Sequence, residues 1–419
     1  MKKIFFPLIF TTLFIIRIVF SFIIWHPDLN NHADWGIRFF EYGTKAFYSP
    51  EANVWSFTWP NQPPGTMYMF AGVRKIYEFV FNIFWQINVK VPAFPSIIVS
   101  YFETNLYPAL LKLPAIMADF GIAYLIYKIT KKKWLSVVWL VNPFVWYNST
   151  IWGQYDSVIN FFALLSFYLL LNRKITASLL FLVLSFYIKA SLLIFAPIWI
   201  IVAFKQKYLV RNWAKSIALT FVVFGLLTLP FADKNPFLWI YELYTKKVFT
   251  QQLHLITANA FNLWSFLAGI HERPDSLPFL GLTYQIWGYI LFGITYISVV
   301  LRLFRSRITN QQSLINILIW SLSVVAFASF VLLTNMHERY LYPLFPYLTM
   351  LLGLGFVWNW FYWGVSFVGL LNMYNFWFTP RFEPIISFLS FNNRLMPRIL
   401  GFIMLLLFLS FFKKYNESK

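Results

Sequence analysis

Long apolar segments alternate with short polar connectors along most of this chain. They fall near residues 4–25, 107–127, 134–148, 157–171, 175–188, 190–204, 213–230, 284–301, 313–333, 343–358, 360–376 and 397–412. A helix that crosses the hydrocarbon core of a bilayer needs about 20 mostly apolar residues, so the pattern predicts about 12 transmembrane helices. We therefore expect an all-α polytopic membrane protein.

The first apolar segment follows Lys2 and Lys3 and could be a signal peptide or a retained anchor. Its apolar run is longer than a signal peptide requires, and Trp25-His26-Pro27 offers no small-residue cleavage site. We expect a retained anchor whose N-terminus is cytoplasmic.

Basic side chains concentrate in the connectors between alternate pairs of apolar segments. The connectors are 128–133, 173–174, 205–215, 302–307 and 413–414. With a cytoplasmic N-terminus all of them face the cytoplasm, as the positive-inside rule requires. Roughly half of the 34 Lys and Arg residues lie there or in the tails, with a single acid, Glu417. The pattern predicts a multi-pass protein of the plasma membrane with both termini in the cytoplasm.

Composition excludes several other classes of protein. The chain is 59% hydrophobic and 12% charged, whereas a soluble domain carries roughly twice that charged fraction. The basic connectors account for the net charge of +19, so we expect no nucleic acid partner. The chain has no Cys, which excludes a disulfide framework and a thiolate metal site.

Two long segments, 26–106 and 231–283, lie on the non-cytoplasmic side of the predicted membrane. Both are rich in aromatic residues, and 66–88 mixes aromatic with charged side chains, which favours a helix in the membrane interface. No internal repeat or Gly/Ser-rich linker divides the chain. We therefore treat 1–419 as one polytopic domain whose long outer loops are partly helical.

The first polar cluster follows the first apolar segment directly. It contains Asp28 and Asp34, with His26, His32 and Trp35 nearby in the sequence. A carboxylate just above the bilayer could act as a general base. It could equally begin a helix, since Asp favours the N-cap and the first turn. The spacing leaves both alternatives open.

The second polar cluster contains Trp152, Gln154 and Asp156, at a predicted outer turn. Asp156 could be an ordinary helix cap. Sugar-binding sites, however, combine aromatic faces with amide and carboxylate groups that bind hydroxyls. The combination favours a role in binding a sugar or an acceptor over a purely structural role.

The third feature is Lys189, which stands alone in an apolar sequence at a predicted outer turn. Its side chain could snorkel to the lipid headgroups. It could also neutralise a phosphate leaving group. The sequence leaves both alternatives open.

The fourth cluster contains His337, Glu338 and Arg339, in the outer turn before the apolar segment at 343–358. Consecutive residues cannot share one helical face, so we expect different partners for each. A Glu–Arg pair can be structural, but Arg is also the preferred bidentate ligand of phosphate. We regard His337 and Arg339 as candidates for phosphate binding and Glu338 as a candidate for sugar or acceptor binding.

Three further polar residues are candidates. Asn259 and Asn262 lie in the second long outer loop and are candidates for sugar or acceptor binding. Asp119 lies inside an apolar segment, where an ionisable side chain is a functional candidate by default. It could equally pair with Lys112 or Arg17 inside the bundle.

All four clusters fall on the non-cytoplasmic face when the topology is fixed from the basic connectors alone. Unrelated structural residues would divide between the two faces. Because nucleotide pools are cytoplasmic, we do not expect a nucleotide-sugar donor at this face.

These motifs resemble those of the GT-C superfamily of membrane glycosyltransferases, and more closely those of prokaryotic proteins related to the second mannosyltransferase of GPI-anchor synthesis. The matching features run in the expected order and are Asp28 seven residues before Trp35, Gly43, Phe47-Tyr48, Pro63-Pro64-Gly65, Asn142-Pro143 with Ser149-x-x-Trp152-Gly153-Gln154-x-Asp156, Asn259-Ala260-Phe261-Asn262-Leu263-Trp264, and Met336-His337-Glu338-Arg339-Tyr340-Leu341-x-Pro343. One departure is Trp59-Pro60-Asn61-Gln62, where a simpler Tyr-Pro-Pro-Gly is common, and it affects acceptor contacts more than chemistry.

The resemblance implies a GT-C-like helical bundle and an inverting glycosyltransferase. The donor would be a hexose, mannose-like, on a polyprenyl phosphate, and the acceptor a hydroxyl of a glycan or glycolipid. It implies no nucleotide cofactor and no metal. Asp28 stands at the family's first-loop Asp position and would be the general base, with Asp34 in reserve. Lys189, His337 and Arg339 would neutralise the phosphate.

A transporter or flippase of lipid-linked glycans is the main alternative. Transport predicts polar groups that reach both faces and often two repeated halves. Here the cytoplasmic connectors are short and nearly free of acids. A non-catalytic scaffold in an envelope-assembly complex is a third, weaker hypothesis.

Overall fold

The computed structural model describes residues 5–49, 60–233, 235–250 and 253–417. Ile4, where the first apolar segment begins, and Trp59 of the predicted acceptor motif lie outside the described residues. The elements follow in chain order: α1 (Phe5–Ile23), α2 (Leu29–Ala46), α3 (Pro64–Lys90), α4 (Ser96–Thr130), α5 (Lys133–Leu140), α6 (Pro143–Trp146), η2 (Tyr147–Trp152), α7 (Asp156–Leu171), α8 (Ile175–Ile188), η3 (Ala190–Phe195), α9 (Ala196–Lys205), α10 (Val210–Thr228), α11 (Pro236–Leu243), η4 (Tyr244–Val248), α12 (Leu263–Ala268), β1 (Pro278–Phe279), β2 (Leu282–Thr283), α13 (Tyr284–Arg305), α14 (Gln311–Leu332), η5 (Glu338–Leu341), α15 (Leu344–Gly353), α16 (Asn359–Tyr374) and α17 (Glu383–Glu417).

Helices account for most of the described chain, and β1 and β2 pair only as a short antiparallel hairpin. Every predicted apolar segment contains a helix. A helix that is apolar on all sides is stable where lipid or neighbouring helices surround it. The predicted all-α class is therefore confirmed.

The described helices differ in whether they are long enough to cross a membrane. Among the described residues, five helices have the length and apolar composition of a membrane span, namely α4, α10, α13, α14 and α17. The part of α1 from Pro7 to Ile23, helices α7 and α8, and the η3–α9 segment are apolar but shorter. The chain is a helical protein with candidate membrane spans, and the count of about 12 crossings stays a prediction.

Several apolar segments form broken helices. Between α5 and α6 the side chain of Asn142 accepts hydrogen bonds from the amides of Phe144 and Val145, which caps the start of α6. The segment after Lys189 begins as the 3-10 helix η3 before α9. Helix α17 is interrupted at 391–394, where the backbone angles are not helical. The breaks at Asn142 and within 190–204 explain why these two apolar segments form no single long helix.

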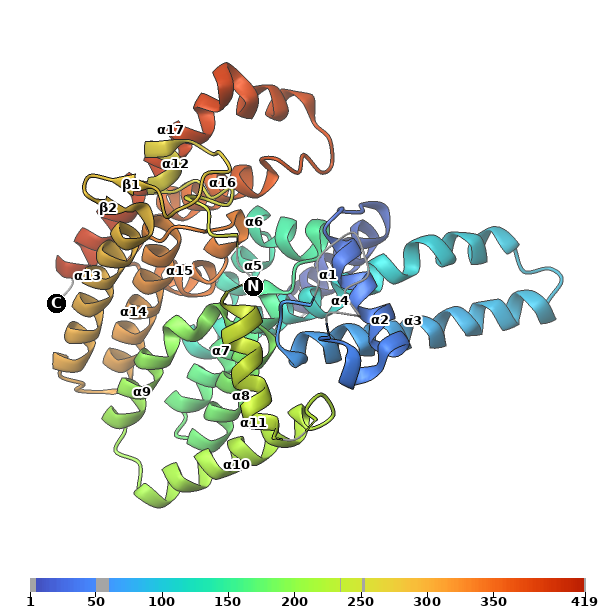
Figure 1. Ribbon diagram of the computed structural model, residues 1–419, viewed down its shortest axis with the longest axis horizontal. Helices are drawn as coiled ribbons and strands as arrows, with labels where there is room; N and C mark the ends of the chain where they lie inside the picture. Colours follow the sequence, from blue (N-terminus) through green and yellow to red (C-terminus); the bar gives the residue numbers. More distant parts are fainter. Residues whose placement is uncertain (1–4, 50–59, 234, 251–252, 418–419) are drawn as a thin grey trace.

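Helix α3 and the first half of α4 form an arm that extends away from the bundle (Figure 1). The sequence predicts a helix at 66–88, and α3 confirms it. Large apolar side chains of the arm are exposed, among them Phe79, Trp85 and Ile97. A position in the membrane interface agrees with that surface and stays a prediction.

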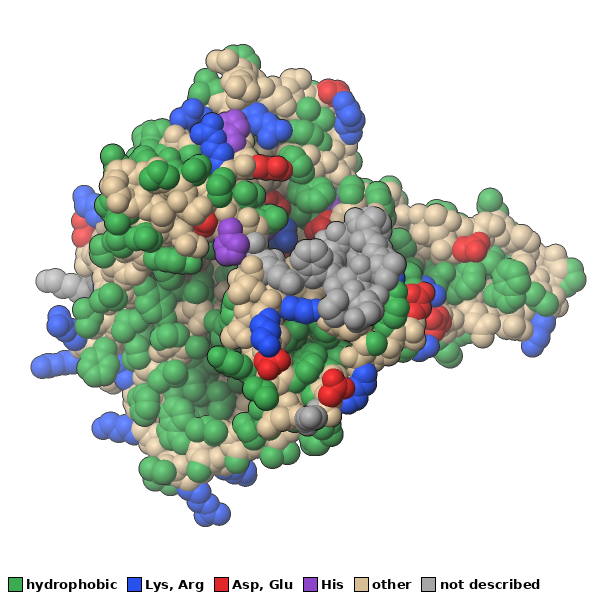
Figure 2. All heavy atoms as spheres, viewed as in Figure 1, with side chains coloured by type: hydrophobic (Ala, Val, Ile, Leu, Met, Phe, Trp, Pro, Cys, Tyr) green, Lys and Arg blue, Asp and Glu red, His purple; other side chains and the backbone are tan. Residues whose placement is uncertain are grey.

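The basic connectors meet at one end of the bundle. Nζ of Lys205, the last residue of α9, donates to the carbonyls of Phe304 and Ser306 at the end of α13, at 3.0 and 2.8 Å. The guanidinium of Arg302 lies 4.2 Å from the ring centroid of Tyr415, near the end of α17. Figure 2 shows Lys and Arg side chains along the lower left edge, beyond a broad hydrophobic area. Connectors far apart in the sequence are therefore neighbours.

Charged residues inside the bundle pair with one another. Arg17 of α1 donates to Oδ2 of Asp119 in α4 at 2.5 Å, and both side chains are fully buried. Ser149 and Tyr342 also donate to Asp119, each at 2.5 Å. Lys112 instead donates to carbonyls at the end of α1. Of the two partners that the sequence left open, Asp119 takes Arg17, and the network ties α1, α4, η2 and the η5 segment together.

Candidate functional site

The carboxylate of Asp28 is the centre of a polar cluster at the opposite end of the bundle from the basic connectors. Asp28 stands immediately before α2, but its side chain makes no capping hydrogen bond to that helix. Instead Oδ2 accepts a hydrogen bond from Nε1 of Trp152 at 3.1 Å and another from Nε2 of Gln154. Oδ1 accepts one from Asn31 at 2.9 Å. The helix-cap alternative for Asp28 therefore does not describe this side chain.

A tight turn brings Trp152 and Gln154 to Asp28. The π-helical turn η2 ends at Trp152, and Gly153 follows with φ of 81°, in the left-handed region that favours Gly. A Cβ at Gly153 would lie 2.6 Å from a methyl carbon of Leu29, beside Asp28. The absence of a side chain at this position allows the two segments to approach so closely.

Charge and burial set the protonation of the cluster. Burial alone would raise the pKa of the Asp28 carboxyl, but neighbouring charges, first among them Arg339, hold it below its usual value of 3.8. Burial lowers the pKa of His26 from 6.5 to about 3 and that of His32 from 6.5 to about 4. At neutral pH Asp28 is therefore a carboxylate beside two uncharged imidazoles.

Arg339 lies in η5 and is the charged group that acts most strongly on the Asp28 carboxylate. Its guanidinium lies 5.5 Å from the ring centroid of Trp152 and 5.6 Å from that of Tyr340. Nη1 donates to Glu338 at 3.3 Å, while Nε is buried without a hydrogen-bond partner. A buried, unpaired Arg donor is costly to leave unbonded, so this Nε is suited to bind an anionic ligand.

Lys189 and Asp156 form a second charged pair. Nζ of Lys189 lies 2.7 Å from Oδ1 of Asp156, and Lys189 is only 5% exposed. The ammonium lies 5.3 Å from the ring centroid of Tyr155 and 5.2 Å from that of Tyr340. Lys189 thus points into the protein instead of snorkelling outward. Oδ2 of Asp156 is buried without a hydrogen-bond partner.

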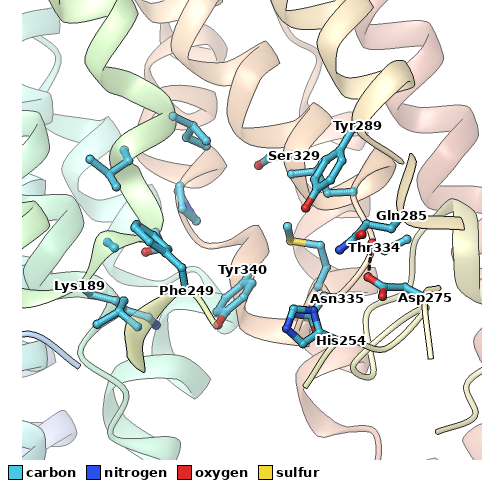
Figure 3. A pocket seen from close by; sticks show the side chains of 18 of the residues that line it. Lys189, Phe249, His254, Asp275, Gln285, Tyr289, Ser329, Thr334, Asn335 and Tyr340 are labelled. Carbon is cyan, nitrogen blue, oxygen red and sulfur yellow. Dashed lines mark hydrogen bonds between the residues drawn. The ribbon is translucent and has the colours of Figure 1, made fainter. Parts of the chain in front are cut away.

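A cavity of about 490 Å³ opens beside this pair (Figure 3). Lys189 and Tyr340 lie on one side of it, and Asp275, Gln285 and His254 lie on the other. Apolar side chains line the space between them, including Leu193, Ile194, Phe249, Leu333 and Met336. Tyr340 contacts both Lys189 and Arg339, so it connects the cavity with the Asp28 cluster.

The structure brings six of the predicted site residues together. These are Asp28, Trp152, Gln154, Asp156, Lys189 and Arg339. Glu338 joins them through its ion pair with Arg339, and burial raises the pKa of the Glu338 carboxyl. Residues that the sequence places in four separate motifs are therefore neighbours in space.

Asp34 lies apart from this cluster. Its carboxylate pairs with Nε of Arg38, one turn later in α2, at 3.0 Å. Burial raises the pKa of the Asp34 carboxyl. Arg38 lowers this pKa in part, and Glu41 raises it further. The reserve base of the sequence prediction therefore has its own partner and no contact with Trp152 or Gln154.

Asn259 and Asn262 are engaged in internal hydrogen bonds. Nδ2 of Asn259 donates to the backbone carbonyl of Asn375 at 3.0 Å, and Oδ1 of Asn259 accepts from Nδ2 of Asn375 at 2.6 Å. Asn262 caps α12 by accepting from the amides of Trp264 and Ser265. The geometry supports structural roles for both, and sugar or acceptor binding by these two residues stays a prediction without support from these contacts.

His337 is adjacent to the site but carries no charge. Its backbone pairs with Ala258 and Asn259, and its ring lies 5.1 Å from that of Tyr340. Burial lowers the pKa of His337 well below 6.5. A neutral imidazole can donate one hydrogen bond to a phosphate but cannot neutralise it.

Two aromatic contacts of the site were not predicted. The rings of His26, Trp152 and Trp377 pack together: the centroid of His26 lies 4.6 Å from that of Trp152 and 4.7 Å from that of Trp377. Trp377 belongs to the segment between α16 and α17, and its ring centroid lies 5.4 Å from that of Trp152. The sequence places Tyr340 only within the motif from Met336 to Pro343 and assigns it no role. In a chain with 22% aromatic residues, no sequence signal separates these rings from the rest.

No group of three or more His, Asp or Glu side chains within the described part of the chain could hold a metal ion. Comparison with protein-family models and with curated protein sequences finds no match. The candidate site therefore has to be interpreted from its own geometry.

Proposed function

We propose that this protein is an inverting glycosyltransferase with a GT-C-like fold. It transfers a hexose, mannose-like, from a polyprenyl-phosphate donor to a hydroxyl of a glycan or glycolipid acceptor. The observation that carries the proposal is the ionised Asp28, held by Trp152 and Gln154 and stabilised by the positive charge of Arg339. A base and cations at one membrane-proximal site are what transfer from a lipid phosphate requires.

In this mechanism the acceptor hydroxyl loses its proton to the Asp28 carboxylate. Its oxygen attacks the anomeric carbon while the bond from that carbon to the phosphate oxygen breaks on the opposite face. The bonding electron pair leaves with the polyprenyl phosphate, so one displacement inverts the configuration. A positioned base contributes about 10²–10⁴-fold, and the remainder comes from orientation and charge stabilisation.

The cations act on the departing phosphate. Arg339 offers an unpaired buried Nε, and Lys189 offers an ammonium at the edge of the cavity. Asp156 keeps one carboxylate oxygen for a hydroxyl of the donor or the acceptor. The apolar wall formed by Leu193, Ile194 and Leu333 suits the first isoprene units of the donor.

The proposed orientation follows from charge. Asp156 begins α7 and the basic pair 173–174 follows its end, so the site and the basic connectors lie at opposite ends of the same helix. With basic connectors in the cytoplasm, the site faces outward from the plasma membrane. A donor that is already bound to a membrane lipid is available there without a nucleotide.

The test is a transfer assay in proteoliposomes with a panel of radiolabelled polyprenyl-phosphate sugars and native-lipid extract as acceptor. Wild type, Asp28→Asn and the matched control Asp34→Asn are compared. Asp28→Asn should lower turnover about 10²–10⁴-fold while labelled donor still copurifies with the protein. Asp34→Asn should keep turnover near that of the wild type.

Two outcomes would overturn the proposal. Turnover that survives in Asp28→Asn but not in Asp34→Asn would move the base to Asp34. Label that crosses the bilayer equally with every variant, without transfer to a new product, would favour a transporter of lipid-linked glycans.

A further inference from the structure

A second cavity, lined by arginines, lies at the basic end of the bundle. It has a volume of about 750 Å³ and is formed by the end of α13, the start of α14 and the connector between them. Arg302, Arg305 and Arg307 line it. Gln285, at the other end of α13, lines the candidate active-site cavity. The 17 residues between Gln285 and Arg302 correspond to about 25 Å of helix, so the two cavities are separate.

The arginine cavity is suited to an anion. Besides the three arginines it is lined by Ser298, Ser306, Ser313 and Asn316, and no carboxylate lines it among the described residues. An adjoining cavity of about 580 Å³ contains Arg173 and Lys205, and Ile308 lines both. Five cations around two adjoining cavities create a local positive potential that attracts phosphate groups.

The simpler explanation is that these residues only orient the chain in the membrane. Such an orientation signal requires basic residues in a connector, but it does not require a shared cavity with a fixed floor. Here Arg302 is held over the ring of Tyr415, and Lys205 is bonded to the end of α13. Trp320 and Phe356 complete the apolar floor. The cavity is thus lined by α13, α14, the connector between them and the segment after α15 that carries Phe356.

An exposed apolar face of α13 leads to this cavity. On α13 the side chains of Ile290, Ile294, Ile297, Leu301 and Phe304 are exposed. Their spacing of three and four residues places them on one face of the helix. The face ends in the turn that carries Arg302 and Arg305. A ligand with a phosphate group and long acyl chains matches both features, whereas free phosphate matches only the first.

We propose that this cavity binds the headgroup of an anionic phospholipid whose acyl chains lie along the exposed face of α13. Arg forms bidentate hydrogen bonds with phosphate, and basic pockets between helices at the cytoplasmic side of membranes bind acidic lipid headgroups. The inference does not depend on the proposed glycosyltransfer, because it concerns the other end of the bundle.

The test is native mass spectrometry of the full-length protein in detergent, titrated separately with phosphatidylglycerol and phosphatidylcholine. The double variant Arg305→Gln/Arg307→Gln changes the cavity. The matched control Arg211→Gln/Lys215→Gln removes the same charge from exposed positions on α10 at the same end. A third titration adds inorganic phosphate to the phosphatidylglycerol complex.

We expect wild type to retain phosphatidylglycerol in preference to phosphatidylcholine. The cavity variant should bind phosphatidylglycerol at least about tenfold more weakly, since one charge-assisted hydrogen bond is worth that factor or more. The control should bind as the wild type does. Equal losses in both variants, or no preference for the anionic lipid, would overturn the proposal. Displacement of the lipid by millimolar inorganic phosphate would show a phosphate site without lipid specificity and would also overturn it.

Discussion

The indole of Trp152 donates a hydrogen bond to the carboxylate of Asp28 at 3.1 Å, across 124 positions of the sequence. The bond joins the segment after α1 to the turn before α7. Gln154 donates to the same oxygen from the same turn. Two donors on Oδ2 fix the direction of the carboxylate, which is a requirement for a base that must meet one particular hydroxyl.

Gly153→Ala should separate Asp28 from its two donors. The new Cβ would lie 2.6 Å from Leu29, and φ of 81° is unfavourable for Ala, so the turn must shift. We expect transfer activity to fall at least tenfold through the turnover number, since a small misplacement of a catalytic group can reduce rate about 100-fold. The measurement is steady-state transfer in proteoliposomes.

The control for this substitution is Gly364→Ala in α16. A Cβ added at Gly364 would meet no neighbouring side chain or segment within 4 Å, and φ of Gly364 is not in the left-handed region. Its activity should equal that of the wild type. If Gly153→Ala is equally active, the close approach of the two segments does not position Asp28.

Arg339→Lys should weaken donor binding although it preserves the charge. A Lys ammonium cannot reproduce the planar fork of guanidinium donors. The variant also lacks the Nε donor, which is buried and unpaired in the wild type. We expect the apparent affinity for polyprenyl-phosphate sugar to fall about tenfold, the equivalent of one charge-assisted hydrogen bond. The KM for donor measures it, with Arg381→Lys, at an exposed pair with Glu383, as the control. Unchanged donor KM would exclude a phosphate contact by Arg339.

Much of the fold could be predicted because apolar composition dictates it. Every apolar segment became helical, and the basic connectors meet at one end. The number of crossings could not be predicted in the same way. The break at Asn142 divides an apolar segment whose composition alone suggests a continuous span, and the segment after Lys189 begins as the 3-10 helix η3 instead of an α-helix. Where a helix breaks depends on capping hydrogen bonds and on packing, and neither can be inferred from amino-acid composition.

The candidate site was partly predictable for a similar reason. Asp28, Trp152 and Asp156 carry polar groups in places where lipid would not tolerate them without partners, so they stand out. Asn259 and Asn262 stand out equally, yet their amides bond to backbone and to Asn375. The sequence does not distinguish a polar side chain that binds a ligand from one that forms hydrogen bonds within the protein.

Thermal stability should fall as the pH decreases from about 6.5 to 4.5, in part through two buried histidines. Burial lowers the pKa of His26 from 6.5 to about 3 and that of His32 from 6.5 to about 4. In this window the unfolded chain binds protons at both positions while the folded chain does not, so acid favours unfolding. Differential scanning fluorimetry in detergent, at steps across the window, measures the slope.

The variant His32→Phe isolates this contribution. His32 stacks on Phe70 with ring centroids 4.5 Å apart, and a Phe ring can occupy the same place. We expect the variant to show a shallower dependence of Tm on pH than the wild type. Parallel slopes for the two proteins would contradict a neutral, buried His32.

Asp119→Asn should destabilise the bundle through its buried ion pair. The substitution leaves Arg17, fully buried and 2.5 Å from the carboxylate, without a counter-charge. Breaking a buried pair from one side costs about 3–5 kcal/mol, whereas an exposed pair contributes about 0–1 kcal/mol. Glu78→Gln, which removes the exposed partner of Arg74, is the matched control.

The measurement is the Tm of each variant in detergent, with the double variant Arg17→Met/Asp119→Asn beside them. We expect a large decrease for Asp119→Asn, almost none for Glu78→Gln, and partial recovery in the double variant, because removing both charges leaves none uncompensated. A double variant that is less stable than Asp119→Asn would mean that Arg17 stabilises the bundle through its contacts with Trp146 and the Leu140 carbonyl instead. Equal Tm for Asp119→Asn and the wild type would show that Ser149 and Tyr342 hold the network without the ion pair.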